Sequence, residues 1–290
     1  TIWGETAVLR LLDKSRSMKH LSELGMPPAT HARYLSIVQK PYGMIVCSGP
    51  TGSGKTTTLY ATLAEITRSE LNVMTIEDPV EYVFPEINQM QINPQADVTF
   101  ASGLKSILRQ DPDVILVGEI RDEETARIAV QSALTGHIVM SSLHATDATS
   151  ALYRLIDMGI EPFLMASSLV GVVGQRLVRK ICPSCVTPYE PTPEERTVYD
   201  HFGGTPKEKF VHGTGCNYCS NTGYRDRVGV YEVLAVTDEI RQLIVTAASP
   251  QDMRALAVSQ GMRAMSHEAM ALVAADVTTI DEVIHNVYIS

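Results

Sequence analysis

The segment Met44-Ile-Val-Cys-Ser-Gly-Pro-Thr-Gly-Ser-Gly-Lys-Thr56 joins a short apolar run to a glycine-rich loop. From Gly49 to Thr56 it matches the pattern GxxxxGK[ST] in full. The apolar run predicts a buried strand and a helix is expected to begin at Lys55, which is the setting in which such a loop binds phosphate. Glycines leave room for backbone N–H groups to surround a phosphate, and the helix N-terminus adds partial positive charge. The alternative interpretation is a plain glycine-rich turn.

The loop therefore predicts a nucleotide site. We expect the Lys55 ammonium to reach the β- and γ-phosphates of ATP and the Thr56 hydroxyl to bind Mg²⁺. The residues predicted to bind the nucleotide are Gly49, Pro50, Thr51, Gly52, Ser53, Gly54, Lys55, Thr56 and Thr57.

On both sides of this loop, short apolar runs alternate with amphipathic stretches. Strands are predicted at 44–48, 72–76, 114–117 and 138–140, and helices at 29–38, 55–67, 100–110, 123–134 and 148–158. Such alternation indicates an α/β fold with a mainly parallel sheet covered by helices on both faces. Further along, a strand is predicted at 228–236 and short helices between 238 and 288, broken near 249 and 261.

Acidic residues follow two of the predicted strands. Glu119 ends the apolar run Val114-Ile-Leu-Val-Gly-Glu119, where a P-loop protein presents an acid to magnesium. Thr75-Ile-Glu-Asp-Pro-Val-Glu81 places three carboxylates after another strand, and like charges gathered in this way need a cation or a purpose. Glu77 and Glu81 are candidates to orient or deprotonate an attacking water. A solvated acidic loop is the alternative.

Two histidines, His137 and His144, flank the predicted strand at 138–140. At strand ends in a nucleotide-binding domain they could sense the γ-phosphate and transmit its loss. By residue type alone, an ordinary structural histidine is the more common interpretation.

Four of the five cysteines form two CxxC pairs, Cys182/Cys185 and Cys216/Cys219. This spacing predicts a tetrahedral Cys₄ zinc site with a structural role, because four protein ligands leave zinc no open position. Free thiols and two redox pairs are the alternatives. Cys47 lies in the apolar run and is expected to be a buried core thiol.

The overall composition excludes some classes of protein. The chain has 290 residues, 44% hydrophobic and 20% charged, and a net charge of −9. This charge disfavours a general nucleic-acid coat or a polybasic membrane anchor. No run of ~18 apolar residues predicts a membrane span.

The motifs, taken in order, resemble one family. The phosphate loop, 75–81, the run 108–122, 136–144 and the tetracysteine element are similar to the type II secretion and type IV pilus assembly ATPases, over about residues 1–245. The resemblance implies a homohexameric motor that is cytoplasmic and associated with the inner membrane through platform and adaptor proteins. Its ATP hydrolysis would power pilus extension or pseudopilus assembly, with ATP, Mg²⁺ and Zn²⁺ bound and without direct nucleic-acid contact.

The resemblance also implies a domain organisation. Residues 1–36, which begin with a predicted strand over 1–13, would be the end of a truncated N-terminal domain plus a linker. A RecA-like ATPase core would span 37–180, the zinc-binding tetracysteine element 181–227, and a C-terminal strand and helical subdomain 228–290.

Site roles follow from matching motifs. Glu119 would be the acid that holds magnesium, Glu81 the general base, and Glu77 its support, while both histidines match the family's His box. Hydrolysis requires positive charge at the transition state, so arginines are also candidates for the site. Arg10 matches an arginine of the family's N-terminal domain that faces the γ-phosphate, and Arg109 and Arg121 match arginines near the strand that ends at Glu119. Lys105 stands where some members carry arginine, and it lacks the guanidinium fork.

Other functions remain open from the sequence. A pilus-retraction motor is one, although such members typically lack the four cysteines. A DNA-uptake or conjugation-type ATPase is another, and a nucleotide-regulated scaffold with negligible hydrolysis is a third.

Overall fold

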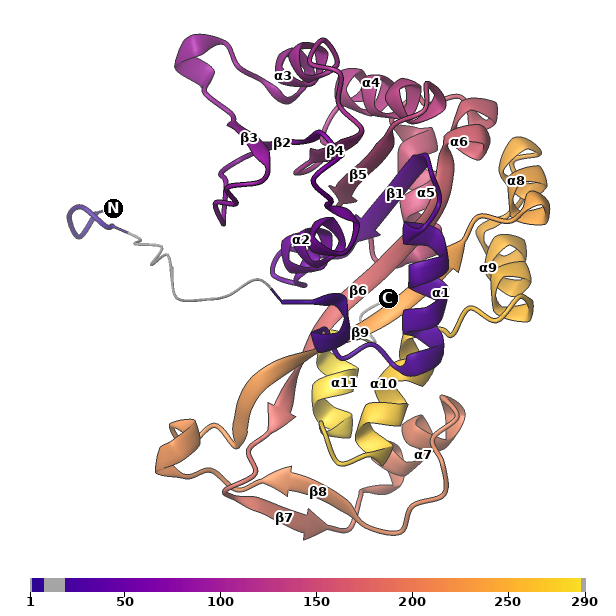
Figure 1. The fold of residues 1–290 in the computed structure, drawn as a ribbon. Coiled ribbons are helices and arrows are strands. Elements are labelled where there is room, and N and C mark those ends of the chain that lie inside the picture. The colour runs from indigo at the N-terminus through magenta and orange to yellow at the C-terminus, as the bar shows by residue number, and fades with distance from the viewer. Residues whose placement is uncertain (1, 8–18, 288–290) are drawn as a thin grey trace.

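The computed structural model describes residues 2–7 and 19–287 (Figure 1). Its centre is a seven-stranded sheet in the order β3-β2-β4-β5-β1-β6-β9. Neighbouring strands are parallel except for β9, which runs antiparallel to β6. The strands are β1 (Gly43–Ser48), β2 (Val73–Glu77), β3 (Asn88–Gln91), β4 (Val114–Val117), β5 (Ile138–Leu143), β6 (Leu169–Ile181) and β9 (Tyr224–Ala235).

Helices cover both faces of this sheet, which confirms the predicted α/β fold. One face packs against α1 (Pro28–Val38) and α2 (Lys55–Ile66), next to the short 3₁₀ helix η1 (Leu21–Glu23). The other face packs against six helices: α3 (Phe100–Ile107), α4 (Glu123–Leu134), α5 (Ala148–Asp157), α6 (Pro162–Ser168), α8 (Asp238–Val245) and α9 (Pro250–Ser259). Strands β1 and β4 are buried along their whole length, as expected for parallel strands between two helical layers.

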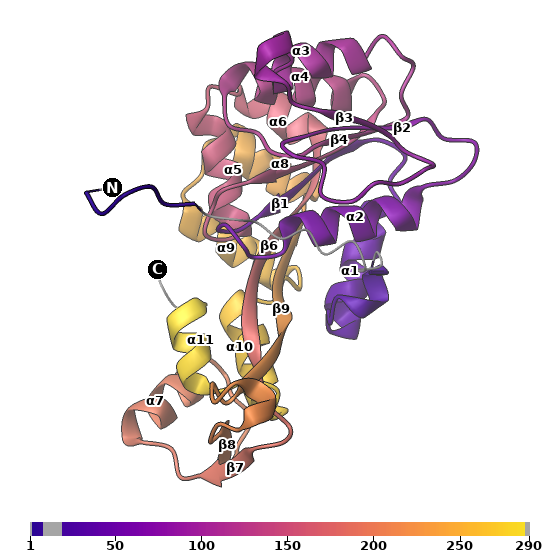
Figure 2. The ribbon, with the colours of Figure 1, turned by 90° about the vertical axis from the view of Figure 1, so that its left-hand side faces the viewer.

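A second, smaller core surrounds the outer half of the long β6–β9 hairpin (Figure 2). Val178 of β6 and Val230 of β9 pack there against buried side chains of the C-terminal helices. Its elements are β7 (Val186–Tyr189), α7 (Pro193–His201), β8 (Phe210–Gly213), α10 (Met265–Ala274) and α11 (Ile280–Asn286). The short 3₁₀ helix η3 (Asn217–Cys219) lies between β8 and β9.

Several elements differ from the sequence expectation. Residues 2–7 contain no strand, and the rest of the strand predicted over 1–13 lies outside the described residues. The division expected at residue 228 falls inside β9, which pairs with β6 and belongs to the central sheet. Helices α8 and α9 also pack on the main core. Strand β6 has no counterpart among the predicted strands, because Gly171, Gly174 and Arg176 interrupt any simple apolar pattern.

Across residues 2–7 and 19–287, no helix combines the length and the apolar character that crossing a membrane requires.

Candidate functional site

The candidate site lies at one edge of the central sheet, where parallel strands β1, β2, β4 and β5 end. The phosphate loop follows β1, Glu77 closes β2, Glu119 follows β4 and His144 follows β5. In open α/β sheets, ligands bind at the carboxyl ends of the strands. The sequence therefore brings residues from four separate segments to one place.

Helix caps fix the loops that carry these residues. The Asp122 side chain accepts a hydrogen bond from the Thr125 N–H (2.8 Å) and caps α4, three residues after Glu119. Asp147 likewise accepts from the Ser150 N–H (2.7 Å) and caps α5, three residues after His144. A side-chain cap of this kind contributes about 1 kcal/mol and leaves little freedom in a short strand-to-helix connection.

The phosphate loop has the backbone that its glycines allow. Gly52 and Gly54 have φ angles of 78° and 89°, in the left-handed region that favours glycine. The Lys55 side chain lies over the loop, where Nζ donates hydrogen bonds to the carbonyl oxygens of Gly49 (2.7 Å) and Pro50 (3.0 Å). Burial lowers the pKa of Lys55, while the negative charge of Glu119 opposes that shift. The ammonium is thus held at the mouth of the loop.

Gln175 of β6, the strand next to β1, holds the phosphate loop in place through hydrogen bonds. It is not among the residues predicted from the sequence. Its side chain is buried, Nε2 donates to the Ser53 carbonyl oxygen (2.8 Å), and Oε1 accepts from the Thr58 hydroxyl (2.7 Å). A Cβ at Gly54 would lie 2.8 Å from Gln175 Nε2, so loop and strand fit closely. The only signal in the sequence is a single amide that directly follows the mostly apolar run of residues 169–174, and this is a weak signal.

The loop fits a phosphate group. A Cβ added at Gly52 would meet nothing within 4 Å, so the loop is open on that side. Among the described residues the buried hydroxyl of Ser53 has no hydrogen-bond partner. An open glycine-lined mouth, an orphaned hydroxyl and a lysine ammonium are the groups that hold a phosphate and its magnesium ion.

Glu119 is the centre of a charged cluster beside this loop. Its carboxylate forms a salt bridge with Arg121, and His144 Nε2 lies 3.4 Å from its Oε2. Arg121 also lies 3.7 Å from Asp78 Oδ2, which joins the loop after β4 to the loop after β2. The hydrogen bond to Glu119 raises the pKa of Arg121. Three of the predicted site residues are therefore in direct contact.

Glu77 and Glu81 have different environments. Glu77 is only 4% exposed, and its carboxylate accepts hydrogen bonds from the side chains of Tyr60, Thr75 (2.6 Å) and Gln89 (3.2 Å). Glu81 is exposed, in the loop between β2 and β3. Of the two acids, Glu81 is the one that can contact water.

Two predicted residues lie at the opposite edge of the sheet. His137 precedes β5, and its Nδ1 lies 2.9 Å from the Ser132 carbonyl oxygen. The six residues of β5 separate it from His144 by about 20 Å, at ~3.3 Å per residue. Arg109 is exposed and follows α3, before β4 begins. Within one chain neither His137 nor Arg109 joins the site, because the site lies at the carboxyl ends of the parallel strands and each of these residues precedes a strand. Arg10 lies outside the described residues.

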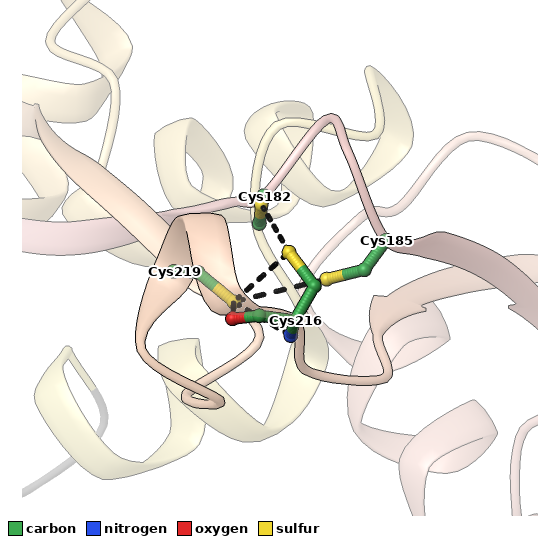
Figure 3. A group of neighbouring side chains, drawn as sticks. All are labelled: Cys182, Cys185, Cys216 and Cys219. Atoms are coloured by element: carbon green, nitrogen blue, oxygen red, sulfur yellow. Dashed lines mark hydrogen bonds between the residues drawn. The ribbon is translucent and has the colours of Figure 1, made fainter.

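The four cysteines converge where β6 ends and β9 begins (Figure 3). Sulfur pairs Cys182/Cys216 and Cys185/Cys219 are each 3.9 Å apart, and Cys216/Cys219 are 3.7 Å apart. Tetrahedral zinc with bonds of about 2.3 Å requires sulfur atoms about 3.8 Å apart, so the arrangement fits that ion. Although burial opposes ionisation, backbone N–H donors of Cys216 and Gly223 help to lower the pKa of Cys219 to about 6.

The sheet, the loop and the clustered acids define a P-loop NTPase fold. A family model described as "Type II/IV secretion system protein" matches residues 1–285, so the chain belongs to this family. The resemblance drawn from the motifs is confirmed.

Individual relatives agree with this assignment. The "Type II secretion system ATPase E" of Vibrio cholerae is 52% identical over 252 residues, which cover 86% of this chain and 50% of that protein. The "Type IV pilus assembly ATPase PilB" of Thermus thermophilus is 43% identical over 288 residues, 98% of this chain and 32% of that protein. The chain thus spans half or less of the length of these two relatives.

A solved structure described as the pilus retraction motor PilT with bound ADP has the same fold. It is 27% identical, with a TM-score of 0.70, and the match covers 94% of this chain and 68% of that one.

Proposed function

We propose that the chain is the ATP-hydrolysing part of a motor that powers type II secretion pseudopilus assembly or type IV pilus extension. The observation that carries the proposal is the convergence of Lys55, Glu119 and His144, from the ends of three parallel strands, beside a loop that fits phosphate. The names of the Vibrio and Thermus relatives support the assignment to secretion or pilus assembly.

The residues suggest how hydrolysis proceeds. The oxygen of a water molecule attacks the γ-phosphorus, the bond from phosphorus to the bridging oxygen breaks, and ADP leaves with that electron pair. Glu81 accepts the proton of the attacking water, since it is exposed in the loop after β2. Lys55 stabilises the charge on the phosphate oxygens, and Arg121, held by Glu119, adds a second positive charge to the site.

Thr56 and Glu119 would hold Mg²⁺, the hydroxyl directly and the carboxylate directly or through water. When bound, the ion would supply charge neutralisation between the β- and γ-phosphates. His144 contacts Glu119, so its position would register a change at that carboxylate. The four clustered thiols would hold Zn²⁺, which would cross-link the segment of residues 182–219. Its role would be structural, because four protein ligands leave the ion no open coordination position.

The assembly and its partners belong to the same proposal. A homohexamer at the cytoplasmic side of the inner membrane, bound to platform and adaptor proteins, is what the family resemblance implies. A retraction motor is the second candidate, favoured by the likeness to PilT. The Cys₄ element favours assembly, because retraction members typically lack it.

Steady-state phosphate release by the full-length protein tests hydrolysis. We expect Mg²⁺-dependent turnover that Lys55→Ala abolishes, while Lys209→Ala, at an exposed position on the smaller core, leaves turnover unchanged. Undiminished turnover in Lys55→Ala would overturn the proposal. Deleting the gene separates the two motor types, since loss of an assembly motor removes pili or secretion, whereas loss of a retraction motor leaves pili in place.

A further inference from the structure

The loop that carries Glu81 packs against the phosphate-binding helix. Tyr60 lies on α2, and its ring meets Tyr82 edge-on at a centroid distance of 5.6 Å and an interplanar angle of 77°. The same ring meets Phe84 at 5.2 Å and 79°. Tyr60 is 2% exposed, so these contacts are part of the core. Both partners lie within three residues of Glu81 in the sequence.

A buried polar network joins the same two elements. The Tyr60 hydroxyl donates a hydrogen bond to Glu77 Oε2, and the other Glu77 oxygen accepts from Gln89 Nε2 at 3.2 Å. Gln89 Nε2 also donates to the Tyr82 carbonyl oxygen (2.9 Å), and Gln89 Oε1 accepts from the Phe84 N–H (2.8 Å). The network therefore runs from α2 through Glu77 to the backbone on the far side of Glu81.

Glu77 is poorly placed to accept a proton from water. It is almost completely buried, and both of its oxygens are engaged by protein donors. Burial and the neighbouring Glu77 carboxylate raise the pKa of Tyr60, so its phenol stays neutral and keeps donating. Since a buried carboxylate surrounded by donors is held in place, the pair forms a fixed anchor rather than a reacting group.

We propose that Tyr60 and Glu77 are positioning residues, which hold the Glu81 loop in register with Lys55. Lys55 and Tyr60 lie on one helix, so the anchor sits about 7.5 Å along a rigid axis from the phosphate ligand. The inference rests on the proposed function, because it concerns where the base stands relative to the γ-phosphate. A misplacement of about 1 Å at such a site can cost up to about 100-fold in rate.

The chain offers a matched control for testing this role. Tyr34 is also buried, and its hydroxyl bonds to Thr62 on the same helix (2.6 Å). Tyr34→Phe removes a hydroxyl that is hydrogen-bonded to α2, and Tyr60→Phe removes a hydroxyl that belongs to α2 itself. Only Tyr60→Phe breaks the network that leads to the Glu81 loop. The assay is kcat for ATP hydrolysis, Kd for MgADP and the unfolding midpoint, all on the full-length protein.

We expect Tyr60→Phe to lower kcat about tenfold while Kd for MgADP stays within about twofold. Tyr34→Phe should lower the unfolding midpoint and leave kcat and Kd unchanged. Equal kcat values for the two variants would overturn the proposal. If Tyr60→Phe does not fold, Gln89→Met provides the same comparison, because it removes the bonds to Glu77 and Tyr82 at a half-buried position.

The pH–rate profile separates positioning from catalysis. Glu77→Gln should reduce kcat but keep the acidic limb of the profile, since Glu81 still accepts the proton. Loss of that limb in Glu77→Gln would show Glu77 to be the base and refute its positioning role. Wild-type turnover that Lys55→Ala abolishes establishes the proposed function separately, so the tyrosine comparison then decides the inference alone.

Discussion

Replacing Glu232 with glutamine should destabilise the folded chain by about 3 kcal/mol. Glu232 lies on β9 and is completely buried. Its Oε1 accepts from the Ala148 N–H (3.2 Å), and its Oε2 accepts from the Met265 N–H (3.1 Å) and from Arg254 (3.0 Å). One carboxylate thus joins the central sheet to the first residues of α5 and α10 and to α9.

The magnitude follows from these partners. In the variant, the amide oxygen can keep the contacts on the side of Arg254, which leaves the NH₂ group facing the Ala148 N–H. An unsatisfied buried N–H costs about 1–3 kcal/mol. The bond to Arg254 also loses its charge assistance, worth about 1 kcal/mol because that side chain is 39% exposed. Together these effects give the expected loss.

Urea unfolding followed by far-UV circular dichroism measures this loss at fixed protein and zinc concentrations. Glu65→Gln on the exposed face of α2 is the control and should change the free energy of unfolding by less than about 0.5 kcal/mol. A loss below about 1 kcal/mol for Glu232→Gln would refute the reasoning, since it would mean that the three hydrogen bonds are not made together.

The same residue gives a pH dependence with a definite sign. Burial raises the pKa of Glu232 above its ordinary value of 4.5, and Arg254 only partly offsets this. The folded chain therefore binds the Glu232 proton more tightly than the unfolded chain does. This preferential proton binding stabilises the folded chain at low pH, and the stabilisation is lost as the pH rises through the folded pKa. The stability difference between wild type and Glu232→Gln should grow from about pH 7 to about pH 5. A difference that shrinks would contradict the assignment.

Two further predictions concern the nucleotide loop and the thiol cluster. Gln175→Met should weaken MgADP binding about tenfold as measured by calorimetry, because Ser53 and Thr58 lose the hydrogen-bond partner that fixes the phosphate loop. An unchanged Kd would contradict this role of Gln175. Protein purified without chelator should contain one zinc per chain, and Cys219→Ser should lose it and lower the unfolding midpoint; less than about half an equivalent in the wild type would count against the site.

Local signals explain what the sequence could predict. The phosphate loop, the helix from Lys55 and each of the two CxxC pairs are short local patterns, and the structure agrees with each, including the convergence of the two pairs across the residues between them. The family and the α/β fold were predicted correctly for the same reason. The roles of Glu81, Glu119 and His144 remain predictions. They are supported by the position of all three residues at the same edge of the central sheet, where the parallel strands end.

The remaining features depend on contacts between distant segments. His137 and His144 look alike in the sequence, and only their positions at the two ends of β5 distinguish them. Glu77 looks like an active acid until its buried partners from α2 and β3 are known. Gln175 carries no motif, because its importance comes from a loop more than a hundred residues earlier in the chain.

Strand β6 also limits which insertions and deletions the fold can tolerate. It carries Gln175 beside the phosphate loop and ends next to Cys182. Its ladder with β9, which shifts register once between Arg179 and Ile181, therefore sets the spacing between the nucleotide loop and the thiols. Side chains alternate across a strand, and a single inserted codon between these residues would turn one set of them to the wrong face. The loop segment of residues 202–209, between α7 and β8, carries no such parity rule, since its length can be absorbed in surface turns. Natural and engineered length variation is therefore expected in that segment and not in β6.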